Sequence, residues 1–240
     1  MHWPQPPEWR TGETAAPPGL DGCVVAVDDH LLVLNKPSGL LSVPGRGPEN
    51  ADCLSARVQA QWPDARVVHR LDMATSGLMA MARGPDAQRT LSEAFAKRLT
   101  HKRYEAVVAG HVDDTAHPRD ADGWHTIDLP LVVDWPNRPR SIVSHTLGKP
   151  SLTRWRVLEH GVKGLHGSGH TRLALEPVTG RSHQLRVHLL ALGHPILGDM
   201  LYAPAAAQAQ APRLLLHATR LCLPHPATGQ MGEWHSPAPF

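Results

Sequence analysis

A run of nine residues at positions 69–77 (HRLDMATSG) constrains this chain more than any other segment. Apolar residues at 67–68 and 78–82 predict strands on both sides of it, so the run is expected to be a turn between strands. An aspartate in such a turn, here Asp72, can present a reactive carboxylate while the sheet holds it still. The commoner role of a loop aspartate is an Asx turn, with the side chain accepting from the amide of Ala74 or Thr75.

Composition gives a weaker indication of function. At 240 residues and 41% hydrophobic content, the chain suits one large domain or two tightly packed lobes. The formal net charge of +2 alone does not identify a nucleic-acid-binding protein. Basic residues nevertheless cluster at 97–103 and at 181–186, and such clusters either follow a phosphate backbone or form an ordinary solvated surface.

Disulfide, metal and membrane sites are not expected. The three cysteines, Cys23, Cys53 and Cys222, are far apart and form no Cys-x-x-Cys pair, which fits a reducing cytoplasm. The 17 histidines are scattered without the short ligand spacings of a metal site. No signal peptide is evident, and no segment approaches the roughly 20 apolar residues that span a bilayer. We therefore expect a cytoplasmic location and no contact with a membrane.

The pattern of elements predicts an α+β fold with a largely antiparallel sheet, because strands and helices mix without regular alternation. Residues 1–19 contain five prolines and are expected to form a flexible tail. Helices are predicted at 52–62 with Asp52 as N-cap, from Gly84 onward, and from an N-cap at Ser182 to Leu192. Further segments predict strands at 23–27, 31–34, 104–112, 153–158 and 172–177, and polar loops at 113–124 and 161–169.

Several blocks resemble one known family. The run HRLDxxTSG is similar to the active-site motif of the RluA-type pseudouridine synthases. Blocks at 35–46, 102–104, 180–188 and 193–199 resemble the other motifs of that family, in the same order. The segment 134–139 (DWPNRP) looks like the RluA branch itself, which modifies both 23S rRNA and tRNA. The similarity extends from about Cys23 to the C-terminus, and ordered blocks are far more specific than a single short motif.

The resemblance implies a pseudouridine synthase fold, with a mixed, mostly antiparallel sheet, flanking helices and a central RNA-binding cleft. Residues 20–240 are then the catalytic domain, and we expect no separate N-terminal RNA-binding domain. Asp72 would be the nucleophile, Tyr104 would stack on the target uracil, and Arg181 would pair with the carboxylate. The reaction is a redox-neutral isomerisation and needs no cofactor or metal.

RNA is the expected partner, in tRNA anticodon and 23S rRNA stem-loops, with no obligate protein partner. Arg70 resembles the residue that fills the space left by the flipped nucleotide. Other basic residues are expected to line the RNA groove: Lys36, Arg46, Lys97, Arg98, Lys102, Arg103, Arg138 and Arg186. Two alternatives remain open: a catalytically inactive RNA-binding module, and a nucleoside glycosidase-like hydrolase. The trio of Asp72, Tyr104 and Arg181 argues against the first, and the lack of a second paired carboxylate argues against the second.

Overall fold

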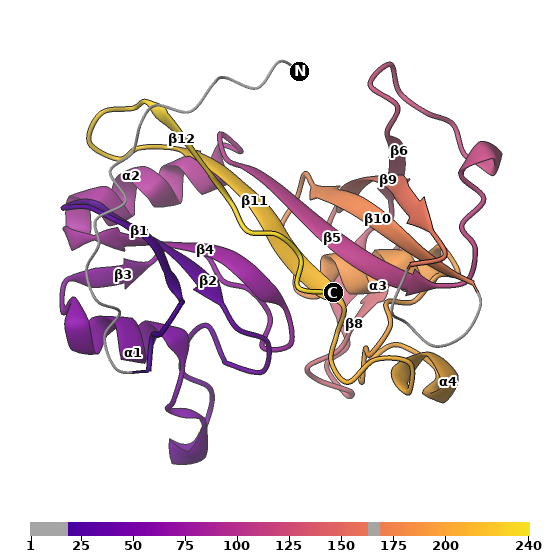
Figure 1. Cartoon of the computed structure of the whole chain (residues 1–240), viewed down its shortest axis with the longest axis horizontal. Coiled ribbons are helices and arrows are strands. Elements are labelled where there is room, and N and C mark those ends of the chain that lie inside the picture. Colours follow the sequence, from indigo (N-terminus) through magenta and orange to yellow (C-terminus); the bar gives the residue numbers. More distant parts are fainter. Residues whose placement is uncertain (1–18, 163–168) are drawn as a thin grey trace. The chain divides into compact units, whose positions relative to one another are not determined.

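The computed structural model describes residues 19–162 and 169–240. The described residues form two compact units (Figure 1). Unit 1 comprises the chain up to Lys102 together with His217–Pro239, and unit 2 comprises Arg103–Leu216 together with Phe240. The tail predicted at 1–19 lies outside the described residues except for Gly19, as does most of the loop predicted at 161–169.

Unit 1 contains a mixed sheet with the order β1-β2-β4-β11, in which β12 also pairs with β11 and β3 also pairs with β4. The strands are β1 (Val24–Val27), β2 (Leu31–Lys36), β3 (Ala65–Val67), β4 (Ser76–Arg83), β11 (Leu216–Pro224) and β12 (Met231–His235). The β4–β11 pair is parallel and the other pairs are antiparallel. Strand β4 is buried from Ser76 to Ala82, as expected for a central strand.

Two α-helices and a 3₁₀ turn (η1, Pro48–Asn50) accompany the described strands of unit 1. Helix α2 (Gly84–Ala96) begins at the glycine and proline that predicted it, and its buried face packs Ala87 and Leu91 into the core. Helix α1 (Leu54–Gln61) differs from the prediction, because its N-cap is Cys53, whose Sγ accepts from the amide of Ala56.

The predicted cap, Asp52, is instead held by a neighbouring guanidinium. Its two carboxylate oxygens accept from Nε and Nη2 of Arg57 at 2.7 and 2.6 Å. Both oxygens of the carboxylate are thus engaged by one guanidinium in a bidentate pair.

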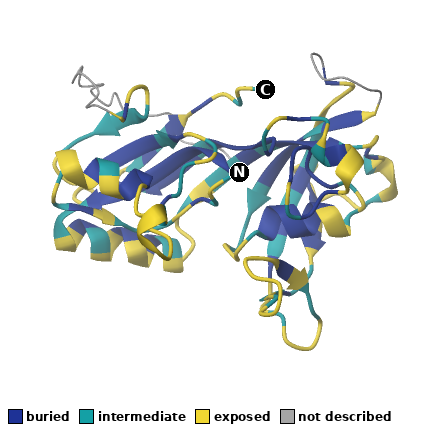
Figure 2. Cartoon of the chain, turned by 90° about the horizontal axis from the view of Figure 1, so that it is seen from below, coloured by how far each residue is buried: buried dark blue, intermediate teal, exposed yellow. Residues whose placement is uncertain are grey.

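Unit 2 contains an antiparallel sheet in the order β5-β10-β9-β6 and a separate β7–β8 hairpin. The strands are β5 (His101–Ala109), β6 (His125–Asp128), β7 (Leu131–Val133), β8 (Ser141–Val143), β9 (Leu152–His160) and β10 (His170–Pro177). Helix α3 (Gln184–Ala191) packs against β8, β9 and β10, while α4 (Ala205–Gln208) and the 3₁₀ turn η2 (Asp114–Ala116) are short. Burial is concentrated in the strands and in α3, whose residues 184–189 are buried, while α1 and α2 each have an exposed face (Figure 2).

One local prediction in unit 2 is wrong. Helix α3 is preceded by His183 in a left-handed conformation (φ 56°), without a side-chain cap, so Ser182 is not its N-cap. The segment 113–124 is a loop, as predicted; it contains the short turn η2 and ends at Trp124, which is 4% exposed. The α+β class and the mostly antiparallel sheet are confirmed.

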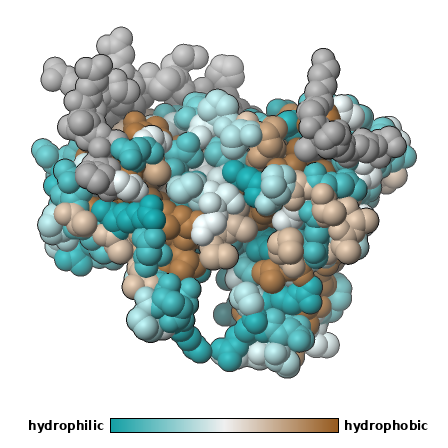
Figure 3. Space-filling model, turned by 60° about the horizontal axis from the view of Figure 1, so that its bottom comes forward, coloured by the Kyte–Doolittle hydropathy of each residue, from teal (hydrophilic) through white to brown (hydrophobic). Residues whose placement is uncertain are grey.

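The surface shows no single dominant apolar region on the face drawn in Figure 3, where apolar and hydrophilic residues are interspersed. Within the described ranges, no helix combines the length and the apolar character needed to cross a bilayer.

Candidate active site

Asp72 lies in unit 1, on the turn that leads into β4. We define residues 71–75 as the nucleophile turn. The amide of Thr75 donates to the main-chain carbonyl of Asp72 at 3.1 Å, so the backbone closes the turn. The Asx-turn interpretation had the Asp72 side chain accept from the amide of Ala74 or of Thr75, and in this structure the Thr75 amide donates to the main-chain oxygen of Asp72. The Asp72 side chain itself is half-buried.

Residues 36–42, which we call the clamp segment, hold the nucleophile turn from one side. Ser42 Oγ donates to the carbonyl of Leu71 at 2.7 Å and accepts from the Leu71 amide at 3.1 Å. Ser38 Oγ donates to the carbonyl of Ala74 at 2.7 Å, and the Gly39 amide donates to the carbonyl of Met73 at 2.9 Å. Every main-chain carbonyl from 71 to 74 therefore accepts a hydrogen bond, and the turn that carries Asp72 is fixed.

Lys36 belongs to this clamp and not to an RNA groove. Its side chain is buried, and its Nζ donates to the carbonyls of Pro37, Leu40 and Met73 at 2.8, 2.7 and 3.0 Å. An ammonium group has three protons to donate. The expectation that Lys36 contacts RNA is therefore corrected, because its protons are directed at main-chain oxygens inside the protein.

A second set of contacts fixes the other end of the turn. Ser76 Oγ lies 2.8 Å from Nδ1 of buried His217, whose Nε2 lies 3.0 Å from Ser236 Oγ. Gly77 has φ 110° and lies so close to Ala218 that a Cβ would come within 2.4 Å of the Ala218 carbonyl oxygen. Only glycine allows both the backbone conformation and this approach of β4 to β11.

His69, at the start of the motif, supports the turn and does not act as a base. Its Nε2 accepts from the Ala80 amide at 2.9 Å, and its ring stacks on Phe95 at 4.5 Å between centroids. Burial, with a smaller effect from the charge of Lys102, lowers the pKa of His69 to about 3. The imidazole is therefore neutral at physiological pH, in the tautomer with its proton on Nδ1.

Within unit 1, the basic residues predicted to bind RNA differ in how far their side chains are exposed to solvent and in whether they pair with a carboxylate. Arg46, Arg70 and Arg98 are exposed. Lys97 is exposed and pairs with Glu93 at 2.9 Å. Lys102 is half-buried, and burial lowers its pKa.

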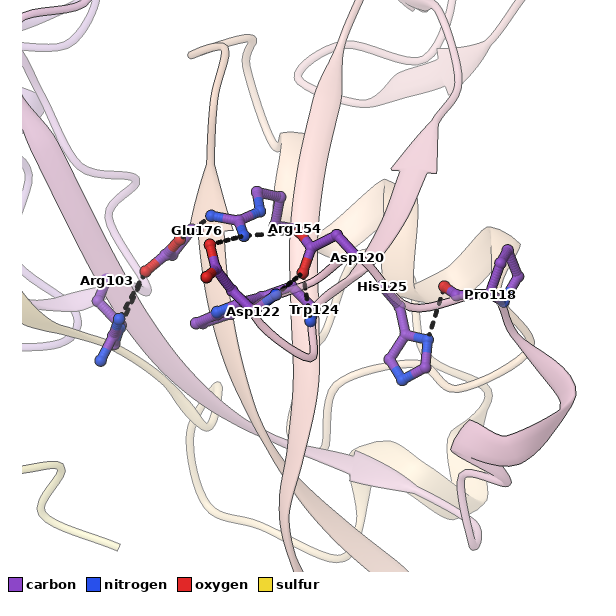
Figure 4. A network of polar contacts seen from close by, with 8 residues as sticks. All are labelled: Arg103, Pro118, Asp120, Asp122, Trp124, His125, Arg154 and Glu176. Carbon is purple, nitrogen blue, oxygen red and sulfur yellow. Dashed lines mark hydrogen bonds and ion pairs between the residues drawn. The ribbon is translucent and has the colours of Figure 1, made fainter. Parts of the chain in front are cut away.

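Tyr104 lies in β5 of unit 2, opposite Leu175 of β10, and is 8% exposed. Side chains alternate along a strand, so Lys102 and Tyr104 share one side of β5 and Arg103 lies on the other. Arg103 there pairs with Glu176 at 2.7 Å (Figure 4). Its guanidinium also lies 5.2 Å from the ring centroid of buried Trp124. Arg103 was expected to line the RNA groove, and in this structure it belongs to a polar network on the face of β5 opposite Tyr104.

That network links three elements of unit 2. Glu176 also pairs with Arg154 at 3.0 Å, and Arg154 pairs with Asp120 at 2.7 Å (Figure 4). Asp120 in turn accepts from the amide of Trp124 at 2.9 Å. The carboxylates of Glu176 and Asp120 thus pair with the guanidinium groups of Arg103 and Arg154 and tie the strands of this face to the loop before β6.

Arg181 lies in the exposed turn before α3. Gln184, the first residue of the helix, accepts from the Arg181 amide at 3.1 Å and from Thr179 Oγ1 at 2.7 Å. Its Nε2 donates to Leu152 O at 2.9 Å and to Thr153 Oγ1 at 3.0 Å, which ties the turn to β9. Gln184 thus holds the turn before α3 in place, whereas the sequence analysis had predicted Ser182 as the residue that caps this helix.

Arg186 is not available to RNA. Its Nε and Nη2 donate to the two carboxylate oxygens of Asp199 at 2.8 and 2.5 Å, and the side chains are only 4% and 1% exposed. The expectation of an RNA contact is corrected, because the charge is neutralised in the interior. Asp199 also accepts from the amides of Leu201 and Tyr202, so the pair organises the segment after α3.

The three predicted catalytic residues come from both units, Asp72 from unit 1 and Tyr104 and Arg181 from unit 2. Sequence reasoning missed the positioning residues Ser42 and Gln184. Both lie inside blocks quoted for the family resemblance, so a search of those blocks for buried hydrogen-bonding side chains would have found them. No cluster of three or more metal-ligating side chains occurs in residues 19–162 and 169–240.

Comparisons with known proteins identify the family. Residues 30–191 match the family model described as RNA pseudouridylate synthase. The chain is 50% identical over 213 residues to "Dual-specificity RNA pseudouridine synthase RluA" of Escherichia coli (strain K12), covering 89% of this chain and 91% of that protein. It is 48% identical over 217 residues to the protein of the same name from Yersinia pestis, covering 90% and 99%.

A solved structure shows the same similarity. "Human RNA Pseudouridylate Synthase Domain Containing 1" superposes with a TM-score of 0.73 at 29% identity, covering 93% of this chain and 87% of that chain. These relationships support the isomerase interpretation over the inactive RNA-binding module and the hydrolase. The chain belongs to the RNA pseudouridylate synthase family, whose members are isomerases.

Proposed function

We propose that this chain converts loop uridines of tRNA anticodon arms and of 23S rRNA hairpins to pseudouridine, with Asp72 as the nucleophile. The observation that supports the proposal is the nucleophile turn, in which each carbonyl from 71 to 74 accepts a hydrogen bond, so the backbone that carries half-buried Asp72 is fixed. The dual substrate range is supported by the printed names of relatives at about 50% identity and by the DWPNRP loop.

The reaction breaks the N1–C1′ bond, rotates the uracil and forms the C5–C1′ bond. The proton lost from C5 is balanced by the proton gained at N1, so the product is an isomer of the substrate. An aspartate carboxylate can add to C1′, add to C6 or remove the proton at C2′, and all three routes begin with this side chain. No electron acceptor enters any of them, and we propose that the enzyme works without a cofactor or an obligate protein partner, in the cytoplasm with its RNA substrates.

Two residues of unit 2 and one of unit 1 complete the proposed chemistry. A guanidinium facing the carboxylate favours its ionised form and orients it, and we assign this role to Arg181. Tyr104 supplies a ring against which the detached uracil stacks, and its hydroxyl assists removal of the C5 proton. Flipping the nucleotide out of its stack costs a few kcal/mol, and exposed Arg70 occupies the vacated space.

The remaining RNA contacts are assigned to exposed Arg46, Lys97, Arg98 and Arg138 and to half-buried Lys102. Loss of one phosphate contact weakens binding and lowers its salt dependence without abolishing the reaction. Arg138→Ala should therefore lower RNA affinity, and unchanged affinity would remove Arg138 from this set.

Pseudouridine mapping by carbodiimide labelling and primer extension tests the proposal. Total tRNA and unmodified 23S rRNA are incubated with the wild-type protein and with Asp72→Asn. Asp52→Asn is the matched control, because Asp52 is an exposed aspartate of the same unit that pairs with Arg57. New stops with the wild type and Asp52→Asn only are expected.

Other outcomes identify the alternatives. Stops with Asp72→Asn would exclude Asp72 as the nucleophile. Bound RNA without stops in any sample would favour an RNA-binding module, and release of free uracil with abasic RNA would favour a hydrolase.

A further inference from the structure

The loop that joins β7 to β8 (residues 134–140) exposes a tryptophan. Trp135 is 66% exposed, whereas Trp124, Trp155 and Trp234 are 4%, 0% and 7% exposed. The guanidinium of exposed Arg138 lies 4.2 Å from the centroid of the Trp135 ring. This stacked pair places an accessible aromatic surface and a positive charge side by side at the tip of a hairpin.

The loop is held in shape by its own hydrogen bonds. The Asn137 amide donates to the Asp134 carbonyl at 3.1 Å, the Asp134 amide to the Arg140 carbonyl at 2.9 Å, and the Arg140 amide to the Asn137 carbonyl at 3.1 Å. Asn137 Nδ2 also donates to the Asp134 carboxylate at 2.9 Å, so the loop's one acidic side chain is engaged. A large aromatic group on a pre-organised loop binds a partner with little loss of conformational entropy.

The base of the loop is anchored to the turn that carries Arg181. Arg140 donates to the carbonyl of Leu201, and its guanidinium lies 5.6 Å from the ring centroid of Tyr202. The Tyr202 hydroxyl accepts from the Ser141 amide at 2.8 Å and lies 2.7 Å from Nδ1 of His183. Tyr202 thus connects the β7–β8 hairpin to His183, two residues after Arg181. A ligand bound by the loop would therefore have a fixed position relative to the turn that carries Arg181.

We propose that Trp135 and Arg138 form a stacking site for one unpaired nucleobase of the substrate RNA, with the Arg138 guanidinium bonding a neighbouring phosphate. The inference rests on the proposed function, because it takes RNA as the ligand. Every base offers a π-face to an aromatic side chain, and a guanidinium pairs strongly with phosphate. The loop carries two arginines and one aspartate, which favours an anionic polymer over an acidic or apolar protein surface.

The test combines variants of the full chain with RNA that lacks single bases. Binding and turnover are measured for wild type, Trp135→Ala and Trp135→Phe, on a synthetic anticodon-arm stem-loop and on copies with one abasic site at each loop position. Leu147→Ala is the control, since Leu147 is 77% exposed and follows β8, away from the loop. The fluorescence of Trp135 is isolated as the difference between wild type and Trp135→Phe.

Trp135→Ala should weaken RNA binding about 5- to 150-fold, with a smaller change in kcat, while Trp135→Phe retains most of the affinity. RNA binding should quench the Trp135 fluorescence, and Leu147→Ala should bind as the wild type does. One abasic position should weaken binding to the wild type but not further weaken binding to Trp135→Ala, which identifies the stacked base.

Two results would overturn the inference in distinguishable ways. If the wild type forms pseudouridine normally and Trp135→Ala binds every RNA equally well, the stacking site is wrong and the proposed function stands. If the wild type neither binds nor modifies any of the RNAs, the proposed function and the stacking site fail together.

Discussion

Ser42→Ala tests whether the clamp segment positions the nucleophile. The Ser42 hydroxyl makes two hydrogen bonds with one residue, donating to Leu71 O at 2.7 Å and accepting from Leu71 N at 3.1 Å. Ser42 and Leu71 are only 2% and 4% exposed, so water does not readily replace the lost hydroxyl. The substitution leaves a buried N–H and a buried C=O unpaired, immediately before Asp72.

The expected magnitude follows from these two groups. An unsatisfied buried polar group costs about 1–3 kcal/mol, so Ser42→Ala should lower the free energy of unfolding of unit 1 by roughly 2–5 kcal/mol. A displacement of a reacting group by about 1 Å costs on the order of a hundredfold in rate. We therefore expect kcat to fall by about 10- to 100-fold, with a smaller change in KM.

Ser38→Ala is the internal control, because Ser38 is half-buried and makes one hydrogen bond, to Ala74 O. Its loss should cost about 0.5–1.5 kcal/mol. Urea unfolding measures the stability of both variants, and amide hydrogen exchange at Leu71 reports directly on the lost acceptor. The reasoning fails if Ser42→Ala is no less stable than Ser38→Ala, or if the Leu71 amide exchanges as slowly as in the wild type.

Three further predictions concern the same framework. The pKa of His69 is lowered to about 3, so its contribution to the free energy of unfolding is complete above about pH 6.5 and falls by up to about 1.4 kcal/mol per pH unit as the pH drops towards 3. Urea unfolding at pH 7 and pH 5 should therefore show a weaker pH dependence of stability for His69→Asn than for the wild type. An equal pH dependence in the two proteins would contradict the burial of a neutral imidazole. Gly77→Ala should destabilise far more than Gly39→Ala, because both have positive φ but only Gly77 faces the Ala218 backbone, and thermal melting compares them. Asp199→Asn should cost about 3–5 kcal/mol in urea unfolding by leaving buried Arg186 without its counter-charge, and a loss under about 1 kcal/mol would refute the importance of the pair.

Local patterns predicted the framework around the site well. The apolar segments on each side of the motif became β3 and β4, and the Gly84–Pro85 pair correctly marked the start of α2. Strand alternation and helix starts depend on neighbours within a few residues, so the sequence carries that information directly. At the start of α1, the predicted cap Asp52 is instead paired with a neighbouring side chain, that of Arg57.

The chemistry-bearing blocks, the fold class and the isomerase family were determined by the sequence itself, because these depend on residue identity in a fixed order. Which basic residues remain available to RNA was decided only by the tertiary structure. Lys36, Arg103 and Arg186 look alike in a sequence, but their partners Met73, Glu176 and Asp199 lie 37, 73 and 13 residues away. A charged side chain takes a structural role when folding buries it and places hydrogen-bond acceptors around it. Because those acceptors come from distant parts of the chain, the residues next to it in the sequence do not predict the pairing.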